Sequence, residues 1–484
     1  ANLGRNEEAE KDYNKAIQLK PNVSELYNNR ATLYTDLGRN EEAEADYNKA
    51  IQLNSDISEL YNNRGTLYAN LGRNEEAEAD YNKAIQLDKN FKDGYIELSY
   101  IYYKKENYNK AIEILEEGIK IYDNHKKDIK QNKNLSEVTL NAKSSNEKIE
   151  SVNVIVKNNI FHFIDEILDN EKLGNKLNKE EKILLVKLIF NIKNLLNDFK
   201  APIKNKKFSH YTKSTNIKYL LNRENPSKFR LNNAVYMNDP EEGKILNKIL
   251  LNETDIKKYI VEDIENYTYL TCFCPYDENK YKNKSDELPM WVHYGENGKG
   301  VSIILNENFF INEDLYEVQY IDIDNFDIYD SKEKTINEIK SLCCYSEEES
   351  LQELVKKLES EEKLKKYLKK IIEILSKYPY DESKENKQFI NLINNLLMYL
   401  SYVIKDKSYE YENEVRLIKF KTYEEAIIDE NMDIPKLYID FEKSITSKMI
   451  DEIIIGPKGD FEAISAYAKY VGIKKVTKSN IKYR

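Results

Sequence analysis

The sequence predicts a multidomain chain: an all-α solenoid of helix-turn-helix repeats, then an α+β domain with a mixed sheet and a long helical insertion. Three observations predict this architecture. Near-identical segments recur every 34 residues at the start of the chain. From Phe208 onward, short β-rich runs alternate with turn signals and helices. The chain of 484 residues is also too long for one compact core.

The period of the first region is carried by small residues. Gly4, Gly38 and Gly72 lie 34 residues apart, and alanines repeat in the same way. Two antiparallel helices approach closely only where small side chains lie at their crossing, so we expect these positions to be helix contacts. The expected crossing residues are Ala31, Gly65 and Ser99 on the first helix of each pair, and Ala43, Ala77 and Ala111 on the second.

With this period and these residues, the region 1–122 resembles the tetratricopeptide-repeat (TPR) family, as a partial first repeat and three more. The resemblance implies that the first helix of each pair forms a groove for a protein or an extended peptide. The polar side chains on that helix carry both donors and acceptors, which suits a peptide backbone. The alternative is an ordinary solvated surface. The groove residues are Glu25, Asn28, Asn29, Thr32, Glu59, Asn62, Asn63 and Thr66.

Two segments separate the repeats from the second domain. Residues 123–150 are rich in Lys, Asn, Ser and Glu and have too few apolar side chains to stabilise a core, so we expect a polar linker. Residues 151–206 show helical spacing and are expected to form a helical connector. The α+β domain then spans 207–484. Because Ala1 already lies inside a repeat, we expect the sequence to be a fragment, with an unknown number of repeats before it.

In the α+β region, polar residues of unusual identity gather at the ends of the expected strands. Those strands are 208–212, 229–231, 268–273, 301–305, 316–321, 415–420 and 453–455, with a helical insertion over about 332–405. The candidate site residues at their ends are His210, Tyr211, Arg230, Tyr236, Asn238, Asp239, Glu242, Trp291, His293, Glu412, Glu414 and Arg416.

The runs FSHYT, FRLNNAVYMNDPEEG, TCFCPYDEN, LPMWVHYGENGKGVSIIL, YENEVRLIKF and EIIIGP, in this order, resemble the bacterial domain of unknown function 2971 over about 208–484. A histidine on the first strand and a glutamate on a late one also look like ADP-ribosyltransferases. That resemblance implies NAD as cofactor, His210 on its ribose, Tyr236 on nicotinamide, and Glu414, aided by Glu412, as the catalytic carboxylate.

Two other interpretations of this domain stay open. In a hydrolase, His210 or His293 would be the general base, and Asp239 or Glu242 would orient it. In a binding platform, the same residues would hold a ligand without chemistry. We therefore expect a TPR-mediated protein-protein interaction scaffold that tethers an uncharacterised effector domain, with an NAD-dependent enzyme or a hydrolase as alternatives.

Composition excludes several classes of function. Charged residues make up 33% of the chain, and no apolar run is long enough to span a membrane. The net charge of -11 makes nucleic acid an unlikely partner. The four cysteines, Cys272, Cys274, Cys343 and Cys344, have no zinc-ligand spacing, so we expect no metal site. Reduced thiols also favour a cytoplasmic location.

Overall fold

The computed structural model describes residues 3–118, 177–222, 228–234, 243–253, 255–260, 268–277, 288–311, 313–343, 349–378, 387–420, 426–429 and 436–481. The chain divides into two compact units, Ala1–Asn153 with Phe161–Lys187 and Val154–Ile160 with Leu188–Arg484. The division at Lys187 falls inside the expected connector 151–206. The expected linker 123–150 lies outside the described residues.

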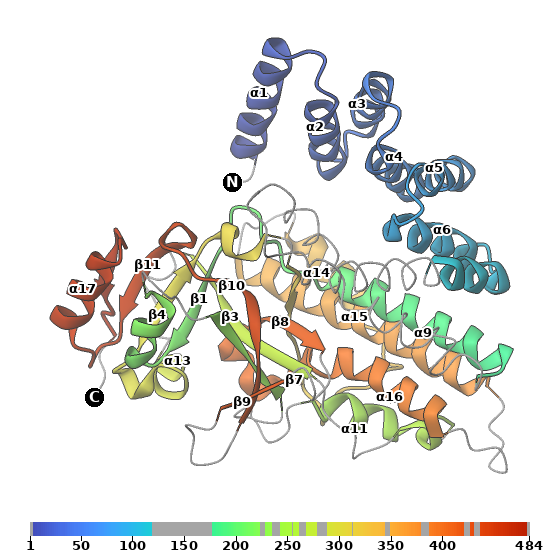
Figure 1. Ribbon diagram of the computed structural model, residues 1–484. Helices are drawn as coiled ribbons and strands as arrows, with labels where there is room; N and C mark the ends of the chain where they lie inside the picture. The colour runs from blue at the N-terminus through green and yellow to red at the C-terminus, as the bar shows by residue number, and fades with distance from the viewer. Residues whose placement is uncertain are drawn as a thin grey trace, which may run out of the picture. The chain divides into compact units, whose positions relative to one another are not determined.

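The first unit consists of antiparallel helix pairs, drawn in blue in Figure 1. The first helices of successive pairs begin 34 residues apart, as the period predicts. The helix bounds are α1 Leu3–Leu19, α2 Ser24–Asp36, α3 Asn40–Leu53, α4 Ser58–Asn70, α5 Asn74–Leu87 and α6 Lys92–Lys104, followed by helical residues 108–118. The predicted TPR architecture is therefore confirmed.

Small residues lie at the helix crossings, as expected. Ala31 and Ala43 are fully buried beside Tyr47. A Cβ atom added to Gly65 would come within 2.9 Å of a ring carbon of Tyr81, so α4 and α5 approach closely there. Each large tyrosine fills the space beside a small residue, and this pairing lets the helix pairs stack.

The second unit is built on a mixed sheet of order β12-β11-β4-β1-β3-β2-β10-β9, with β8 pairing both β3 and β5. All pairs in it are antiparallel except β11 with β12, and β6 pairs with β7 in a separate parallel ribbon. The strand bounds are β1 Lys207–Thr212, β2 Lys228–Asn233, β3 Thr268–Tyr276, β4 Val301–Leu305, β5 Leu315–Glu317, β6 Gln319–Ile321, β7 Ile404–Asp406, β8 Val415–Phe420, β9 Ile427–Asp429, β10 Lys436–Ser444, β11 Ile450–Ile455 and β12 Val476–Lys478.

Helices accompany this sheet, several of them from the predicted insertion. Asn191 of α9 donates to the carbonyl of Tyr367 on α15 at 3.2 Å, which joins two long helices that run side by side in Figure 1. The α-helix bounds are α9 Lys179–Asp198, α10 Ile217–Leu220, α11 Ile245–Leu251, α13 Leu288–His293, α14 Glu333–Cys343, α15 Glu349–Ser376, α16 Lys387–Ser401 and α17 Phe461–Tyr470. The predicted α+β class is confirmed, although the run 316–321 forms two strands, β5 and β6.

The sheet has two faces with different packing. Alternate residues such as Phe273, Val415 and Ile303 point into the main hydrophobic core, and we call this the core face. Cys272 and Arg416, paired in register, point to the other side, which we call the second face. A smaller cluster of Tyr211, Met290, Trp291, Ile304 and Ile454 covers part of the second face.

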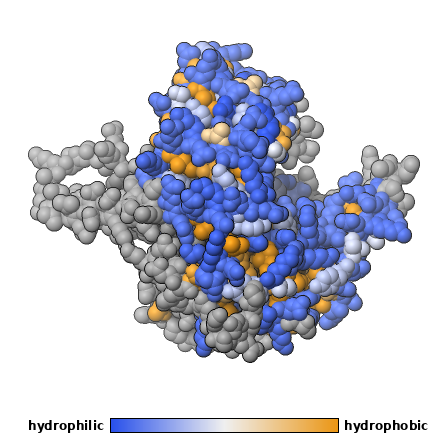
Figure 2. Space-filling view, turned by 90° about the vertical axis from the view of Figure 1, so that its right-hand side faces the viewer, coloured by the Kyte–Doolittle hydropathy of each residue, from blue (hydrophilic) through white to orange (hydrophobic). Residues whose placement is uncertain are grey.

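The surface is mostly polar. On the face drawn in Figure 2, hydrophilic residues cover most of the described surface, with smaller hydrophobic areas between them. Within the described ranges, no helix is both long enough and apolar enough to cross a membrane.

Candidate functional site

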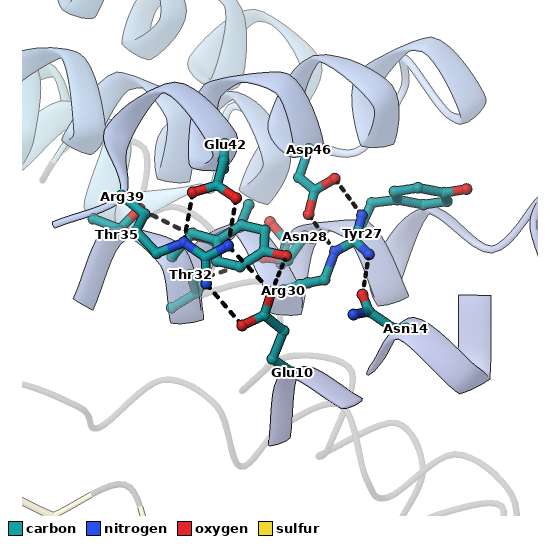
Figure 3. A network of polar contacts seen from close by, with 12 residues as sticks. Glu10, Asn14, Tyr27, Asn28, Arg30, Thr32, Thr35, Arg39, Glu42 and Asp46 are labelled. Atoms are coloured by element: carbon teal, nitrogen blue, oxygen red, sulfur yellow. Dashed lines mark hydrogen bonds and ion pairs between the residues drawn. The ribbon is translucent and has the colours of Figure 1, made fainter. Parts of the chain in front are cut away.

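A repeating polar ladder fixes the helices that carry the candidate groove. Figure 3 shows Arg30 of α2 between Asp46 and Asn14, and Arg39 between Glu42 and Glu10. Arg30 binds both oxygens of Asp46 at 2.6 and 2.7 Å, so a planar guanidinium locks α2 onto α3. Hydrogen bonds from Arg39 lower the pKa of the Glu10 carboxyl, despite its partial burial.

The same ladder recurs one period later. Arg64 binds Asp80, and Arg73 binds Glu44 at 2.7 Å while lying 4.2 Å from the centre of the Tyr68 ring. Each guanidinium is therefore held by charge and by an aromatic face together. The ladder orients the first helix of each pair, and with it the candidate groove residues.

The structure exposes only part of the predicted groove. Asn28 was expected at the surface but is buried, because its Oδ1 accepts a hydrogen bond of 3.1 Å from Nδ2 of Asn63 on the next first helix. This is a correction: the amide of Asn63, the position equivalent to Asn29, binds Asn28 of the preceding repeat. Among the other groove residues, Glu25, Asn29, Thr32 and Glu59 are exposed, whereas Asn62, Asn63 and Thr66 are half-buried.

The two groove threonines already have intramolecular partners. Thr32 and Thr66 donate to the carbonyls of Asn28 and Asn62, four residues earlier, at 3.1 and 3.0 Å. Each threonine hydroxyl also forms a hydrogen bond with a tyrosine hydroxyl of the following helix, Thr32 with Tyr47 and Thr66 with Tyr81. By contrast, Oδ1 of Asn62 is buried and has no hydrogen-bond partner among the described residues. The amides, more than the hydroxyls, are therefore the groups on this face with unused hydrogen-bonding capacity.

In the second unit, four charged side chains form a buried cluster that we call the charge tetrad: Lys405, Glu412, Glu414 and Arg416. Their side chains are at most 2% exposed. Lys405 Nζ lies 2.5 Å from Glu412 Oε2 and 3.6 Å from Glu414 Oε2. Arg416 donates to Glu414 Oε2 through Nη2 and Nε at 2.7 and 3.1 Å, and to the Tyr402 carbonyl at 2.8 Å.

Local backbone geometry brings the two glutamates together. Glu412 ends a short 3-10 helix, Lys407–Glu412, and Glu414 directly precedes β8. Between them Asn413 adopts a left-handed conformation with φ of 44°. The turn at Asn413 therefore lets both carboxylates reach Lys405.

Burial and charge push the pKa values of the two carboxyls apart. Burial raises the pKa of Glu412, and the neighbouring Glu414 charge adds to this, against the opposing effect of Lys405. Burial would also raise the pKa of Glu414, but Arg416 and Lys405 together outweigh it and hold that pKa below its ordinary value. Glu412 is thus the more easily protonated of the two carboxyls, and Glu414 is the one that stays ionised to lower pH.

Partly exposed side chains surround the tetrad. The Tyr294 hydroxyl donates to Glu412 Oε1 at 2.9 Å, and the Cys274 thiol donates to the Glu412 carbonyl at 3.3 Å. Burial, with the nearby Glu414 and Glu412 charges, strongly raises the pKa of Tyr294, so its hydroxyl remains a donor. The Tyr320 hydroxyl accepts the Glu414 backbone N–H at 2.9 Å.

His210 lies apart from the tetrad, on the core face. Its ring packs at 4.8 Å from Phe229 and 5.6 Å from Phe273, and it pairs in register with Ile303. Nδ1 lies 3.2 Å from the Cys272 carbonyl, so the neutral ring donates there. Burial lowers the pKa of His210 to about 4. The expected arrangement, with His210 and Glu414 holding one NAD, is therefore not present, because the two residues project from opposite faces of the sheet.

The remaining candidates fall into three groups. Tyr211 and Trp291 lie on the second face with their rings 5.0 Å apart. Arg230 is exposed and lies over the Tyr438 ring at 4.1 Å, and His293 is exposed at the end of α13. Tyr236, Asn238, Asp239 and Glu242 lie outside the described residues. In the part of the chain that the structure describes, no group of three His, Cys, Asp or Glu residues is arranged to hold a metal.

Sequence reasoning missed two members of the site, Lys405 and Tyr320. Lys405 follows the run YLSYVI, but Asp406 and Lys407 come directly after it, so the sequence does not mark this lysine as buried. Tyr320 gave no signal, because it is one of 38 tyrosines and its neighbour Glu414 is 94 residues away.

Family models match both parts of the chain. Tetratricopeptide-repeat models match residues 24–57 and 58–91, and residues 1–23 and 93–125. The model described as a protein of unknown function (DUF2971) matches residues 290–417, a range that includes the tetrad but not His210. The chain therefore carries N-terminal TPR repeats and a C-terminal DUF2971 region, as its residues predicted.

Several solved structures are similar to part of the chain. The match to MamA is 26% identical, covers 25% of this chain and 71% of that one, and has a TM-score of 0.23. YrrB, described as a TPR protein with an unusual peptide-binding site, is 26% identical over 23% of this chain and 58% of its own, with a TM-score of 0.21. The TPR2B domain of yeast Sti1, in a pHsp70 complex, is 28% identical over 20% and 76%, with a TM-score of 0.19. No curated protein matches the chain significantly.

Proposed function

From the premise that this chain joins TPR repeats to a DUF2971 region, we propose that it is a scaffold that recruits a protein through the repeats and tethers an effector domain to it. The repeats themselves support a protein-interaction role, since stacked helix pairs leave an extended surface open for docking. Tethering would raise the concentration of the effector near the recruited protein. The proposal divides the chain into four segments: the repeats (1–122), a polar linker (123–150), a helical connector (151–206) and the α+β domain (207–484).

One observation carries the recruiting role. The first helices present exposed Glu25, Asn29, Thr32 and Glu59 beside half-buried amides, while the polar ladder holds these helices in fixed positions. An extended peptide has unpaired N–H and C=O groups, and asparagine side chains satisfy both kinds. The preferred partner is therefore an extended segment of a protein, held mainly through its backbone.

The test is selection of peptides from a random display library on the full chain, followed by affinity measurement on variants. Asn29→Ala, at an exposed position of α2, and Asn62→Ala, which removes an amide oxygen without a partner among the described residues, should each weaken the selected peptide several-fold, by about 1 kcal/mol for each lost hydrogen bond. Gln52→Ala is the matched control, since it is exposed on the second helix of the repeat that contains Asn29. If Gln52→Ala weakened binding of the peptide equally, or if neither groove variant weakened it, the peptide-binding proposal would be refuted.

A second candidate function is enzymatic, and the split pKa values of Glu412 and Glu414 favour it. We propose the tetrad as the site of an NAD-consuming or hydrolytic reaction, with Glu414 as the ionised carboxylate and Glu412 as proton donor. Incubation of the full chain with NAD should release nicotinamide, and Glu412→Gln should abolish the release. His210→Phe should leave turnover intact because His210 faces the core. If the wild-type chain released no nicotinamide, the proposal of an NAD-consuming reaction would be refuted.

A further inference from the structure

The two carboxylate oxygens of Glu414 differ in their contacts. Oε2 takes all three cationic contacts, two from Arg416 and one from Lys405. Oε1 is buried and accepts no hydrogen bond from the described residues, although the side chain is fully buried. A buried acceptor without a donor is unfavourable, and most buried polar groups in native proteins have a partner. Because Oε1 has none among the described residues, a bound ligand can supply the missing donor.

The direction of this oxygen is fixed before any ligand arrives. Arg416 is anchored by the Tyr402 carbonyl, Lys405 by Glu412, and the backbone of Glu414 by the Tyr320 hydroxyl. Rotation of the carboxylate would break its contacts with Arg416. A preoriented acceptor of this kind selects ligands by the placement of a single donor.

Charge balance selects among possible donors. With both glutamates ionised the tetrad is neutral, and with Glu412 protonated it carries one net positive charge, so neither state leaves a negative charge uncompensated. A further buried cation would have no opposing charge, and the cost of its dehydration would not be recovered. A neutral N–H donor such as a carboxamide avoids this cost.

Half-buried Cys272 and Tyr294 form a layer beside the tetrad, although β3 lies in the interior of the sheet. The Tyr294 hydroxyl donates to Glu412, and, against the effect of burial, a hydrogen bond from the Cys272 thiol helps to lower the pKa of the Glu414 carboxyl. In the adjoining cluster, the fully buried Trp291 has an Nε1 donor without a partner among the described residues. A carboxamide supplies both a donor and an acceptor to such surroundings.

We propose that the tetrad binds a small neutral aromatic carboxamide, which donates an N–H to Glu414 Oε1 and packs its ring against the aromatic side chains beside it. This names the ligand class of the second candidate function, but binding requires neither turnover nor a peptide on the repeats. Failure of the binding test and failure of the NAD assay are therefore separate results.

The experiment uses three probes of the same shape and different charge: benzamide, benzamidinium and benzoate. Trp291 is the only tryptophan of the chain, so its fluorescence reports on this site in the full-length protein. Benzamide should change this fluorescence saturably, benzoate should not bind, and benzamidinium should bind at least tenfold more weakly than benzamide. No saturable response to benzamide, or tighter binding of either charged probe, overturns the proposal.

Matched variants locate the site. Glu414→Gln replaces the Oε1 acceptor by an N–H₂ donor and should weaken benzamide at least tenfold. Glu452→Gln is the control, because Glu452 is also buried on the second face but both its oxygens are bonded, to Thr477 and to Tyr276 and Lys475. It should bind benzamide as the wild type does, and an equal loss there overturns the assignment.

A second variant keeps the test valid if Glu414→Gln does not fold. Cys272→Leu leaves all four tetrad residues in place and adds bulk to the layer through which the ligand must pass. It should abolish the benzamide response while far-ultraviolet circular dichroism stays unchanged. Wild-type affinity in a folded Cys272→Leu chain would overturn the proposal.

Discussion

Replacing His210 by phenylalanine should make the second unit less sensitive to acid. In the folded chain burial lowers the pKa of this histidine from 6.5 to about 4. The unfolded chain therefore binds a proton between these two values and the folded chain does not. The stability that this difference provides is complete above pH 6.5 and is lost as the pH falls from 6.5 toward 4.

The size of the effect follows from linkage. Between pH 7 and pH 5, a group that titrates at 6.5 when unfolded and about 4 when folded removes about 2 kcal/mol of stability. His210→Phe keeps the ring packing on Phe229 and Phe273 but loses the 3.2 Å contact with the Cys272 carbonyl. At pH 7 the variant should therefore be about 1 kcal/mol less stable than the wild type.

The assay is urea unfolding at the two pH values, followed by the fluorescence of Trp291, which reports on the second unit. The loss of unfolding free energy from pH 7 to pH 5 should be about 2 kcal/mol smaller in His210→Phe than in the wild type. His293→Gln, which removes an exposed histidine, is the control and should keep the wild-type loss. Equal losses in His210→Phe and the wild type would refute the packing of a neutral His210 ring against Phe229 and Phe273.

Three further changes test other parts of the structure. Glu106→Gly should raise the melting temperature of the repeats, seen by circular dichroism, because Glu106 has φ of 56° and a left-handed non-glycine residue costs about 1–2 kcal/mol. Lys405→Met should cost about 3–5 kcal/mol in urea unfolding, and adding Glu412→Gln should recover part of it; equal costs would contradict a coupled tetrad. Asn63→Ala should cost about 1–2 kcal/mol in thermal unfolding, since it leaves the buried Asn28 oxygen without a donor; no change would contradict the amide pairing.

The repeats could be predicted almost completely from the sequence because their fold depends on local periodicity. Each copy repeats its small residues at the same interval, and the helix pairs follow from that spacing. The error at Asn28 has a non-local cause. Its partner Asn63 is 35 residues away, and only stacking of successive pairs brings the two amides together.

In the C-terminal region, three residues of the charge tetrad were selected as candidates from the sequence, but their geometry was not predictable. Glu412, Glu414 and Arg416 were identified because polar residues at the mouth of an apolar strand are unusual. Which face a strand residue occupies depends on the register with its neighbours, and a single sequence does not contain that register. His210 therefore looked like a companion of Glu414, although pairing with Ile303 directs it into the core.

The fourth repeat keeps an ion pair between helices although the residues of its turn differ. Earlier copies place glycine in the left-handed turn and an arginine directly after it, as at Gly72 and Arg73. The fourth copy has Glu106 in that turn, and Lys105, one residue before it, bonds Glu78 at 2.8 Å. Because the lysine stem reaches the same kind of acceptor from a different position, the charge contact is kept while the turn becomes strained.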